Sequence, residues 1–263
     1  MKIREITDAL EDFAPLALQD SYDNAGLQIG LTGDVDATGV LLCIDVTEAV
    51  VDEAIAKGCN MVVSHHPLLF HPLKSISGKD YIERVIIKAI KNDITLYAAH
   101  TNLDNAKGGV SYRMAEKLGL SDLSWLEPKQ GVDAGSGLVG NIDPMPIAQF
   151  IEMVQRTFGV DCIRHNDWHG NTVKRVALCG GAGAFLMSKA MAAGADAFIT
   201  GEIGYHRFFG HENQLLLLEL GHYESEQYTT EILREIIEKV AKDVKIICTS
   251  IKTNPVYYHC AEH

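Results

Sequence analysis

The sequence predicts an α/β protein in which two intertwined lobes arise from an internal duplication, each lobe being a mostly parallel sheet flanked by helices. The first observation behind this prediction is that short apolar runs alternate with segments of helical periodicity. The second is that parts of the first half return in the second half at fixed offsets. Alternating strands and helices are typical of parallel sheets with helices packed on their faces.

The composition is that of an ordinary globular protein. Of the 263 residues, 47% are hydrophobic and 22% are charged, so the chain can bury a sizeable core. The 35 acidic residues against 23 basic ones give a formal net charge of −12. This charge argues against general binding to phosphate backbones, so nucleic acid is not an expected partner. An anionic substrate would have to be met locally, by a metal or a few basic side chains.

Cysteine usage and the lack of targeting signals predict a cytoplasmic protein. The six cysteines are scattered without a Cys-x-x-Cys pair, which favours reduced thiols over disulfides. The N-terminal residues lack the apolar core of a signal peptide. No apolar run reaches about 18 residues, so no transmembrane span is expected.

The first half of the chain contains most of the predicted elements. Apolar residues at positions 3, 6, 10 and 13 predict a helix that ends before Pro15. The polar segment 20–30 is expected to be a plain surface loop, although a loop folded over a site has the same composition. Thr47 is the expected N-cap of a helix. The pattern then predicts strands 40–45, 60–64 and 94–99, and helices 47–57, 80–91 and one ending at Leu118.

The second half begins with the segment most typical of a linker. Residues 121–140 contain Pro128 and four glycines. A helix is expected over 146–158 and a polar loop over 161–171.

The duplication is visible in matched segments. Residues 176–179 and 192–200 match 40–43 and 56–64 at an offset of 136, and 215–220 match 93–98 at an offset of 122. Chance similarity of two strand–helix units is the alternative, but paired His-x-x-x-acid endings favour duplication. We expect a first α/β repeat over 1–125 and a second, including the linker, over 126–263. The two repeats are expected to form one compact unit with a metal cleft between them.

Two stretches contain side chains typical of metal sites. The apolar run from Val62 ends in His65 and His66, and the proline that follows cannot continue a strand. Both histidines should therefore lie at the carboxyl end of a strand, where ligands gather in α/β sheets. In the second stretch, His222 and Glu226 are one helical turn apart on one face. Asp104 follows a third predicted strand end.

These three imidazoles and two carboxylates can serve two divalent metal ions if one carboxylate bridges them. Mixed nitrogen and oxygen ligands suit Zn, Mn, Fe, Co or Ni without choosing among them. The alternative is that each histidine is a surface or hydrogen-bonded residue with no chemical role. Recurrence of suitable side chains at three predicted strand ends favours the metal site.

Two further residues are candidates for catalytic roles. His100 stands before Asp104 and could orient a ligand or move protons, or belong to a simple polar loop. Glu202 lies at a corresponding strand end and could face the same cleft, or be solvated. The glycine run 180–184 could hold a phosphate at a helix N-terminus, but close packing of helix on strand is preferred, because the run lacks the Lys-Ser/Thr of a P-loop.

At these motifs the sequence resembles the NGG-interacting-factor-three-like proteins, a family also known as type 2 GTP cyclohydrolase I. The matching stretches occur in family order at 23–28, 63–67, 100–104, 200–202 and 221–226. The resemblance implies α/β lobes around a cleft and ring-shaped homohexamers. It also implies a dinuclear metal centre bridged by Glu226 and completed by the four other ligands named above. Longer family members carry an inserted middle domain, where this chain has only the segment 121–140.

The resemblance also implies an activity. It is the hydrolytic opening of the guanine ring of GTP, in which metal-bound hydroxide would attack C8 and His100 would move protons. We therefore expect a dinuclear-metal-dependent hydrolase that acts on a nucleotide or related small molecule. The alternative is a noncatalytic metal-binding protein, either a metal chaperone or a regulatory adaptor.

Overall fold

The computed structural model describes residues 1–30 and 34–259, and it divides into two compact units. Unit 1 consists of Met1–Leu103 and Thr229–Tyr257. Unit 2 consists of Asp104–Tyr228 and the terminal segment that starts at Tyr258. The units therefore do not follow the expected boundary at residue 125. The chain returns to unit 1 after Tyr228 because its last helix and last strand pack on the first sheet. The repeat boundary itself, as a statement about duplicated sequence, stays a prediction.

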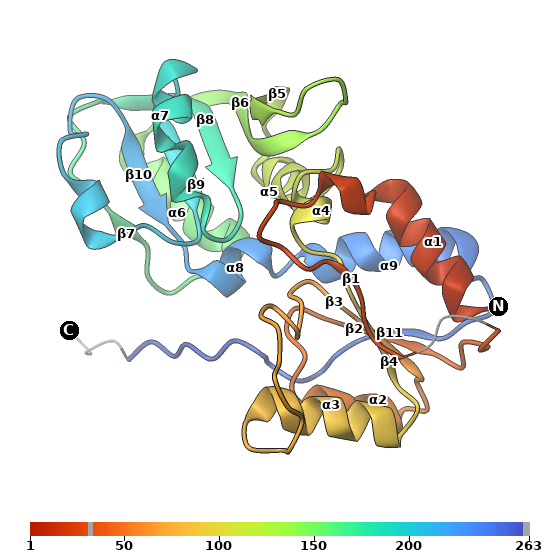
Figure 1. Cartoon of the computed structure of the whole chain (residues 1–263). Coiled ribbons are helices and arrows are strands. Elements are labelled where there is room, and N and C mark those ends of the chain that lie inside the picture. The colour runs from red at the N-terminus through yellow and green to blue at the C-terminus, as the bar shows by residue number, and fades with distance from the viewer. Residues whose placement is uncertain (31–33, 260–263) are drawn as a thin grey trace. The chain divides into compact units, whose positions relative to one another are not determined.

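Unit 1 contains a sheet whose centre is parallel (Figure 1). Its order is β1-β4-β3-β2-β11, and only β1 runs antiparallel to its neighbour. The strands are short and their inner members are buried along their whole length, as expected for a sheet covered on both faces. Their bounds are β1 Gly26–Ile29, β2 Val40–Cys43, β3 Met61–Ser64, β4 Thr95–Ala98 and β11 Ile246–Cys248.

Helices cover both faces of this sheet. α2 (Glu48–Ala56) and α3 (Tyr81–Lys91) bury their apolar faces against the strands, and Thr47 is the N-cap of α2 because its side chain accepts a hydrogen bond from the Val50 amide. α1 (Ile3–Phe13) and α9 (Thr229–Val240) pack against each other on the opposite face. The first helix, the N-cap and the alternation of strands and helices are therefore confirmed.

Unit 2 is built around a sheet of order β5-β6-β8-β9-β10-β7. Strands β8, β9 and β10 are parallel, whereas the three outer pairings are antiparallel. The α/β class is confirmed, and the mostly parallel arrangement holds for the sheet of unit 1 and for the centre of this one. The bounds are β5 Ser121–Pro128, β6 Gly135–Pro146, β7 Arg164–His165, β8 Thr172–Cys179, β9 Ala197–Thr200 and β10 Leu216–Glu219.

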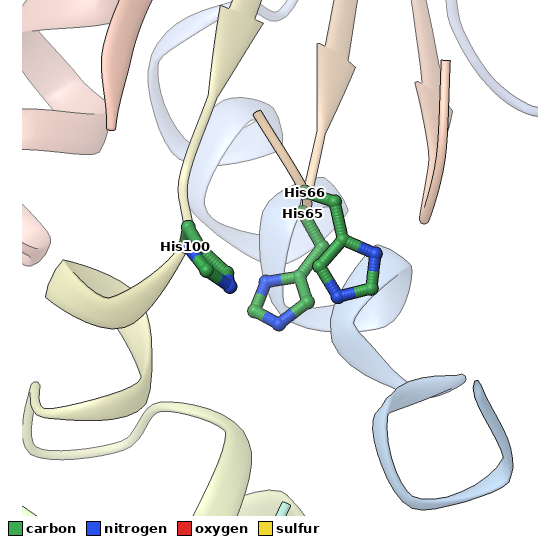
Figure 2. A group of neighbouring side chains, drawn as sticks. All are labelled: His65, His66 and His100. Carbon is green, nitrogen blue, oxygen red and sulfur yellow. The ribbon is translucent and has the colours of Figure 1, made fainter. Parts of the chain in front are cut away.

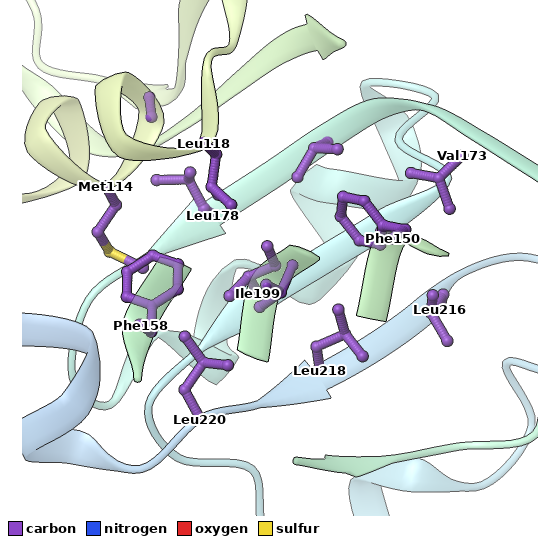
Figure 3. Close-up of a cluster of buried hydrophobic side chains, with 14 of the residues drawn as sticks. Met114, Leu118, Phe150, Phe158, Val173, Leu178, Ile199, Leu216, Leu218 and Leu220 are labelled. Atoms are coloured by element: carbon purple, nitrogen blue, oxygen red, sulfur yellow. The ribbon is translucent and has the colours of Figure 1, made fainter. Parts of the chain in front are cut away.

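One face of this second sheet forms the core with α5 (Val110–Leu118) and α6 (Ile147–Phe158). Figure 3 shows Phe150 and Phe158 of α6 lying against the branched side chains of the central strands. A second cluster covers the other face, where η2 (Gly183–Leu186) and α7 (Met187–Ala192) pack. Unit 2 is therefore also a sheet with helices on both faces.

The predicted linker is wrong, because residues 121–140 lie in the hairpin of β5 and β6. Three of its four glycines, at positions 135, 137 and 140, are closely packed inside β6, whereas Gly131 lies in the turn between the strands. A Cβ at Gly137 would lie 3.0 Å from the Leu178 carbonyl oxygen, and the φ of this glycine is +62°. Glycine inside a strand often marks such a close approach. A glycine-rich strand nevertheless has the same composition as a flexible linker, so the sequence does not distinguish the two.

The strand registers support the duplication. In unit 1 Val40 pairs with Met61, and in unit 2 the residues 136 positions later, Val176 and Ala197, pair in the same way. The predicted match of the third strands is off by one residue. The offset of 122 pairs Ala98 with Leu220, but in the two ladders Ala98 occupies the position of Glu219. The extra residue lies just before α8 (His222–Glu226), where Gly221 adopts a φ of +103°.

In the part of the chain that the structure describes, no helix has the length and apolarity needed to cross a membrane.

A buried carboxylate anchors the loop that follows His66. Glu83, in the first turn of α3, is 0% exposed. Its Oε2 accepts hydrogen bonds from the Ser77 amide (2.7 Å), the Ser77 hydroxyl (2.9 Å) and the Lys79 amide (3.1 Å). The Ser77 amide, against the opposing effect of burial and together with the other donors, lowers the pKa of Glu83 to about 2. The ionised form therefore stabilises the folded loop.

Glu83→Gln is expected to destabilise the protein in a pH-dependent way. Because the folded-state pKa is depressed, the contribution of Glu83 is complete above its ordinary pKa of 4.5 and is lost as the pH falls toward 2. Urea unfolding followed by circular dichroism should thus give the largest gap between wild type and variant at pH 7 and a smaller gap at pH 3. Glu48→Gln, which removes a surface partner of Arg84, is the control. A gap that is constant from pH 7 to 3 would contradict this assignment.

Candidate metal centre

Two histidines are held at the carboxyl end of β3 by continuation of the parallel ladder. The His65 amide donates to the Cys43 carbonyl (3.2 Å), and the His66 amide donates to the Ile44 carbonyl (3.0 Å). Pro67 then ends the pairing because it has no amide proton. The predicted placement of both histidines at a strand end is therefore confirmed.

The ring of His65 is buried and oriented by the neighbouring strand. The side chain is 0% exposed, and its Nδ1 lies 2.8 Å from the carbonyl oxygen of Ala99, the residue after β4. A carbonyl can only accept, so the Nδ1–H donates and the lone pair of the neutral ring is on Nε2. This is the arrangement by which proteins prepare a histidine for a metal.

The ring of His66 is oriented by a carboxylate. Its Nδ1 lies 2.7 Å from Oδ1 of Asp45, which follows β2. The other oxygen, Oδ2 of Asp45, accepts a hydrogen bond from the Thr253 hydroxyl (3.0 Å). A carboxylate on Nδ1 fixes the tautomer and raises the basicity of Nε2, as in carboxylate–histidine–zinc arrangements.

His100 has a similar carboxylate partner. Its Nδ1 lies 2.8 Å from Oδ1 of Asp23, whose Oδ2 accepts from the Thr101 amide (3.0 Å) and the Thr101 hydroxyl (2.5 Å). Burial works to raise the pKa of Asp23, but these hydrogen bonds outweigh it and lower the pKa to about 2. Asp23 is therefore ionised beside His100. The expected plain surface loop over 20–30 is wrong, because residues 20–25 fold over the histidine group and Gly26–Ile29 form β1.

The three rings form one group within unit 1. Figure 2 shows His65, His66 and His100 gathered just beyond the strand ends. The ring centroids lie 4.9 to 5.4 Å apart, and one ring nitrogen of each falls within 4.8 Å of the others. Three imidazoles at this spacing fit a divalent cation. His100, expected as a proton carrier, thus also has the position of a possible ligand.

Unit 2 brings together the second set of candidates. His222 and Glu226 lie one turn apart on α8, with the His222 Nε2 3.2 Å from the Glu226 Oε2. The other ring nitrogen of His222, Nδ1, lies 2.8 Å from Oε1 of Glu202, which follows β9. Glu202 therefore orients His222 from a neighbouring strand end. The shared helical face predicted for His222 and Glu226 is confirmed.

Glu226 is a buried carboxylate with a second carboxylate beside it. Its side chain belongs to a residue that is only 3% exposed, and a carboxylate oxygen of Asp104 lies within 4.8 Å of it. Two ionised carboxylates at this distance would repel each other strongly in a buried site. A divalent cation would remove that cost, so the pair fits metal binding.

The glycine run after β8 makes room for this carboxylate. A Cβ at Gly181 would lie 2.2 Å from Oε1 of Glu226, and the φ of Gly181 is +58°. The Gly181 amide donates to the hydroxyl of Ser225 (2.9 Å), the residue before Glu226. The run therefore packs closely against α8, and close packing rather than phosphate binding accounts for its glycines.

Sequence reasoning missed Asp23 and Asp45 as the partners of two histidines. Asp23 lies in one of the stretches that carry the family resemblance, and this was the available signal. Asp45 follows the end of a predicted strand, like the histidines themselves, but a single acidic residue there is too common to single out.

Gly181→Ala is expected to destabilise unit 2 and to displace the Glu226 carboxylate. Gly159→Ala is the matched control, because Gly159 also has a positive φ (+61°) but nothing lies within 4 Å of its missing Cβ. Both variants should lose about 1 kcal/mol from the strained backbone, and Gly181→Ala should lose clearly more. Chemical unfolding measures both. Equal losses would show that the approach of Glu226 does not constrain Gly181.

Comparison with known proteins places the chain in a family. Residues 1–255 match the model of the Duf34/NIF3 (NGG1p interacting factor 3) family. The chain is 32% identical to a GTP cyclohydrolase 1 type 2 homolog of Clostridium perfringens, over 97% of this chain and 98% of that one. It is 34% identical to the homolog of the same name from Lactococcus lactis, over 98% of this chain and 99% of that one.

The fold also matches solved structures. The crystal structure of a Bacillus cereus protein related to NIF3 superposes with a TM-score of 0.91 at 26% identity, covering 98% of this chain and 99% of that chain. Sequence and fold agree over nearly the whole length. The chain therefore belongs to the Duf34/NIF3 family.

Proposed function

We propose that the protein is a dinuclear-metal-dependent hydrolase acting on a nucleotide or related small molecule, with ring opening of the GTP cyclohydrolase type as the leading reaction. The observation that carries this proposal is the orientation of the histidines. Each of His65, His66 and His100 has its Nδ1 on a carbonyl or carboxylate oxygen. If the three histidines only filled space in the core, their Nδ1 atoms would not all need an oxygen partner.

The proposed ligands are the five side chains that the sequence singles out. His65, His66 and His222 would provide imidazole nitrogens, and Asp104 and Glu226 would provide carboxylate oxygens. Glu226 is the proposed bridge, because within unit 2 it neighbours both Asp104 and His222. Three imidazoles and two carboxylates without thiolate suit two ions of Zn, Mn, Fe, Co or Ni.

The residues around the ligands have separate roles. Bound divalent ions would supply Lewis-acid activation of water and of the substrate. His100, held by the ionised Asp23, is placed to accept and return a proton at its other ring nitrogen. Glu202 keeps the ring of His222 in one orientation. We therefore assign the proton transfer to His100 and a positioning role to Glu202.

The names of the relatives support GTP or a related nucleotide as the first substrate to test. The cytoplasmic location and the ring-shaped homohexamer stay predictions. A noncatalytic role in metal handling is the competing function, and it predicts the same metal stoichiometry without turnover.

Metal analysis of the purified protein is expected to give two divalent ions per chain. Asp45→Asn should weaken metal affinity about 10- to 100-fold, because the amide cannot support the His66 ring as a carboxylate does. Asp52→Asn, which removes a surface carboxylate paired with Lys88, should leave affinity unchanged. Titration with Zn²⁺ or Mn²⁺ against a competing chelator measures both. A wild-type protein that binds less than one ion would contradict the proposed centre.

Turnover of a nucleotide panel tests the hydrolase. Metal-loaded wild type should convert at least one nucleotide, and His66→Ala or Glu226→Gln should reduce kcat by about 10²-fold or more, as expected for loss of a metal ligand. His169→Ala is the control, since this histidine is half exposed and lies beside Asn213. Full metal occupancy with no turnover of any nucleotide would instead support the metal-handling role.

A further inference from the structure

A cavity of about 640 Å³ lies within unit 1, between the loop that precedes β1 and the loop that follows His66. This volume falls in the range of small-molecule sites, roughly 300 to 1,000 Å³. Its walls are mostly aliphatic and aromatic. The apolar lining includes Tyr22, Ile29, Phe70, Leu73, Ile76 and Ile90.

The amide side chains in the wall are already used to join the two loops. The Asn24 Nδ2 donates to the Leu69 carbonyl (2.7 Å), and the Gln28 Oε1 accepts from the Leu69 amide (3.1 Å). The Gln28 Nε2 also donates to the Asn24 carbonyl (2.6 Å). These bonds join the two loops. They use the amide groups of the wall, so few polar groups remain to bind a polar ligand.

The charge of the wall selects against anions. Asp23 lines the cavity, and its Oδ1 lies 2.8 Å from the His100 Nδ1. Among the described residues that line the cavity there is no lysine or arginine, and the imidazole of His71 is the one basic side chain. A phosphate or carboxylate would therefore lose hydration here without gaining a lysine or arginine partner.

The cavity lies next to the histidine group. Asp23 is both a wall residue and the partner of His100. The Phe70 ring lies 6.1 Å from the His100 ring and 6.2 Å from the Tyr22 ring. A planar molecule in the cavity would thus meet aromatic faces and edges within a few ångströms of His100.

We propose that this cavity binds the uncharged, planar aromatic part of the substrate and presents the adjoining bond to the residues around His100. The identification of the occupant as a substrate rests on the proposed hydrolase function. The binding of a neutral aromatic molecule does not.

Ligand-observed NMR on the full-length, metal-free protein tests the site with indole and indole-3-carboxylate. Indole should bind, and the carboxylate should bind at least about tenfold more weakly. Ile76→Trp, which fills the cavity from an exposed wall position, should weaken indole binding about tenfold or more. Phe70→Ala should weaken it by removing the ring beside His100. Phe185→Ala, which removes an exposed aromatic side chain of unit 2, should leave binding unchanged.

Three results would overturn the proposal. They are no indole binding at millimolar concentration, equal binding of the two probes, or indole binding that Ile76→Trp does not change. A change of oligomeric mass in Ile76→Trp without indole binding would assign the cavity to a contact with a second copy. The assay uses neither metal nor turnover. Indole binding together with an inactive metal-loaded protein would therefore contradict the hydrolase function and support the aromatic binding site.

Discussion

The orientation of imidazole rings by oxygen atoms from neighbouring strand ends is the constraint on which the site depends. Cys43, Ser64 and Ala98 are the last residues of three adjacent parallel strands and lie in register. The next residues of each strand must therefore leave the sheet at the same edge. This brings the carbonyl of Ala99 to His65 and the carboxylate of Asp45 to His66.

Unit 2 applies the same constraint to a different set of side chains. Its three central strands end in register at Cys179, Thr200 and Glu219. Beyond them, Gly181 packs on the buried Glu226, and Glu202 orients His222. The duplicated architecture thus provides a histidine-rich strand end in unit 1 and a carboxylate-rich one in unit 2.

Buried polar groups make these strand ends costly without a ligand. Imidazoles and carboxylates removed from water must be hydrogen-bonded or charge-compensated. Four of these imidazoles are hydrogen-bonded through Nδ1, to oxygens of Ala99, Asp45, Asp23 and Glu202. Within unit 2, carboxylate oxygens of Asp104 and Glu226 lie within 4.8 Å of each other, a spacing that fits a divalent cation. The cavity beside His100 is mostly apolar, and its described lining residues include no lysine or arginine. Within unit 1, the histidine group and the apolar cavity beside it would therefore recognise different parts of one molecule.

The sequence by itself determined the three central strands of each sheet and the strand ends at which the candidate ligands lie. Hydrophobic periodicity and the N-cap at Thr47 are local properties, so they could be predicted from neighbouring residues. The tertiary structure decided which acceptors orient the histidines, because Asp23 is 77 residues from His100 and Asp45 is 21 residues from His66. It also decided that 121–140 forms a hairpin, and that the chain has one more residue between β10 and α8 than the sequence match predicts. Glycine has the same composition signal in a linker and in a closely packed strand, and only the packed neighbours distinguish the two.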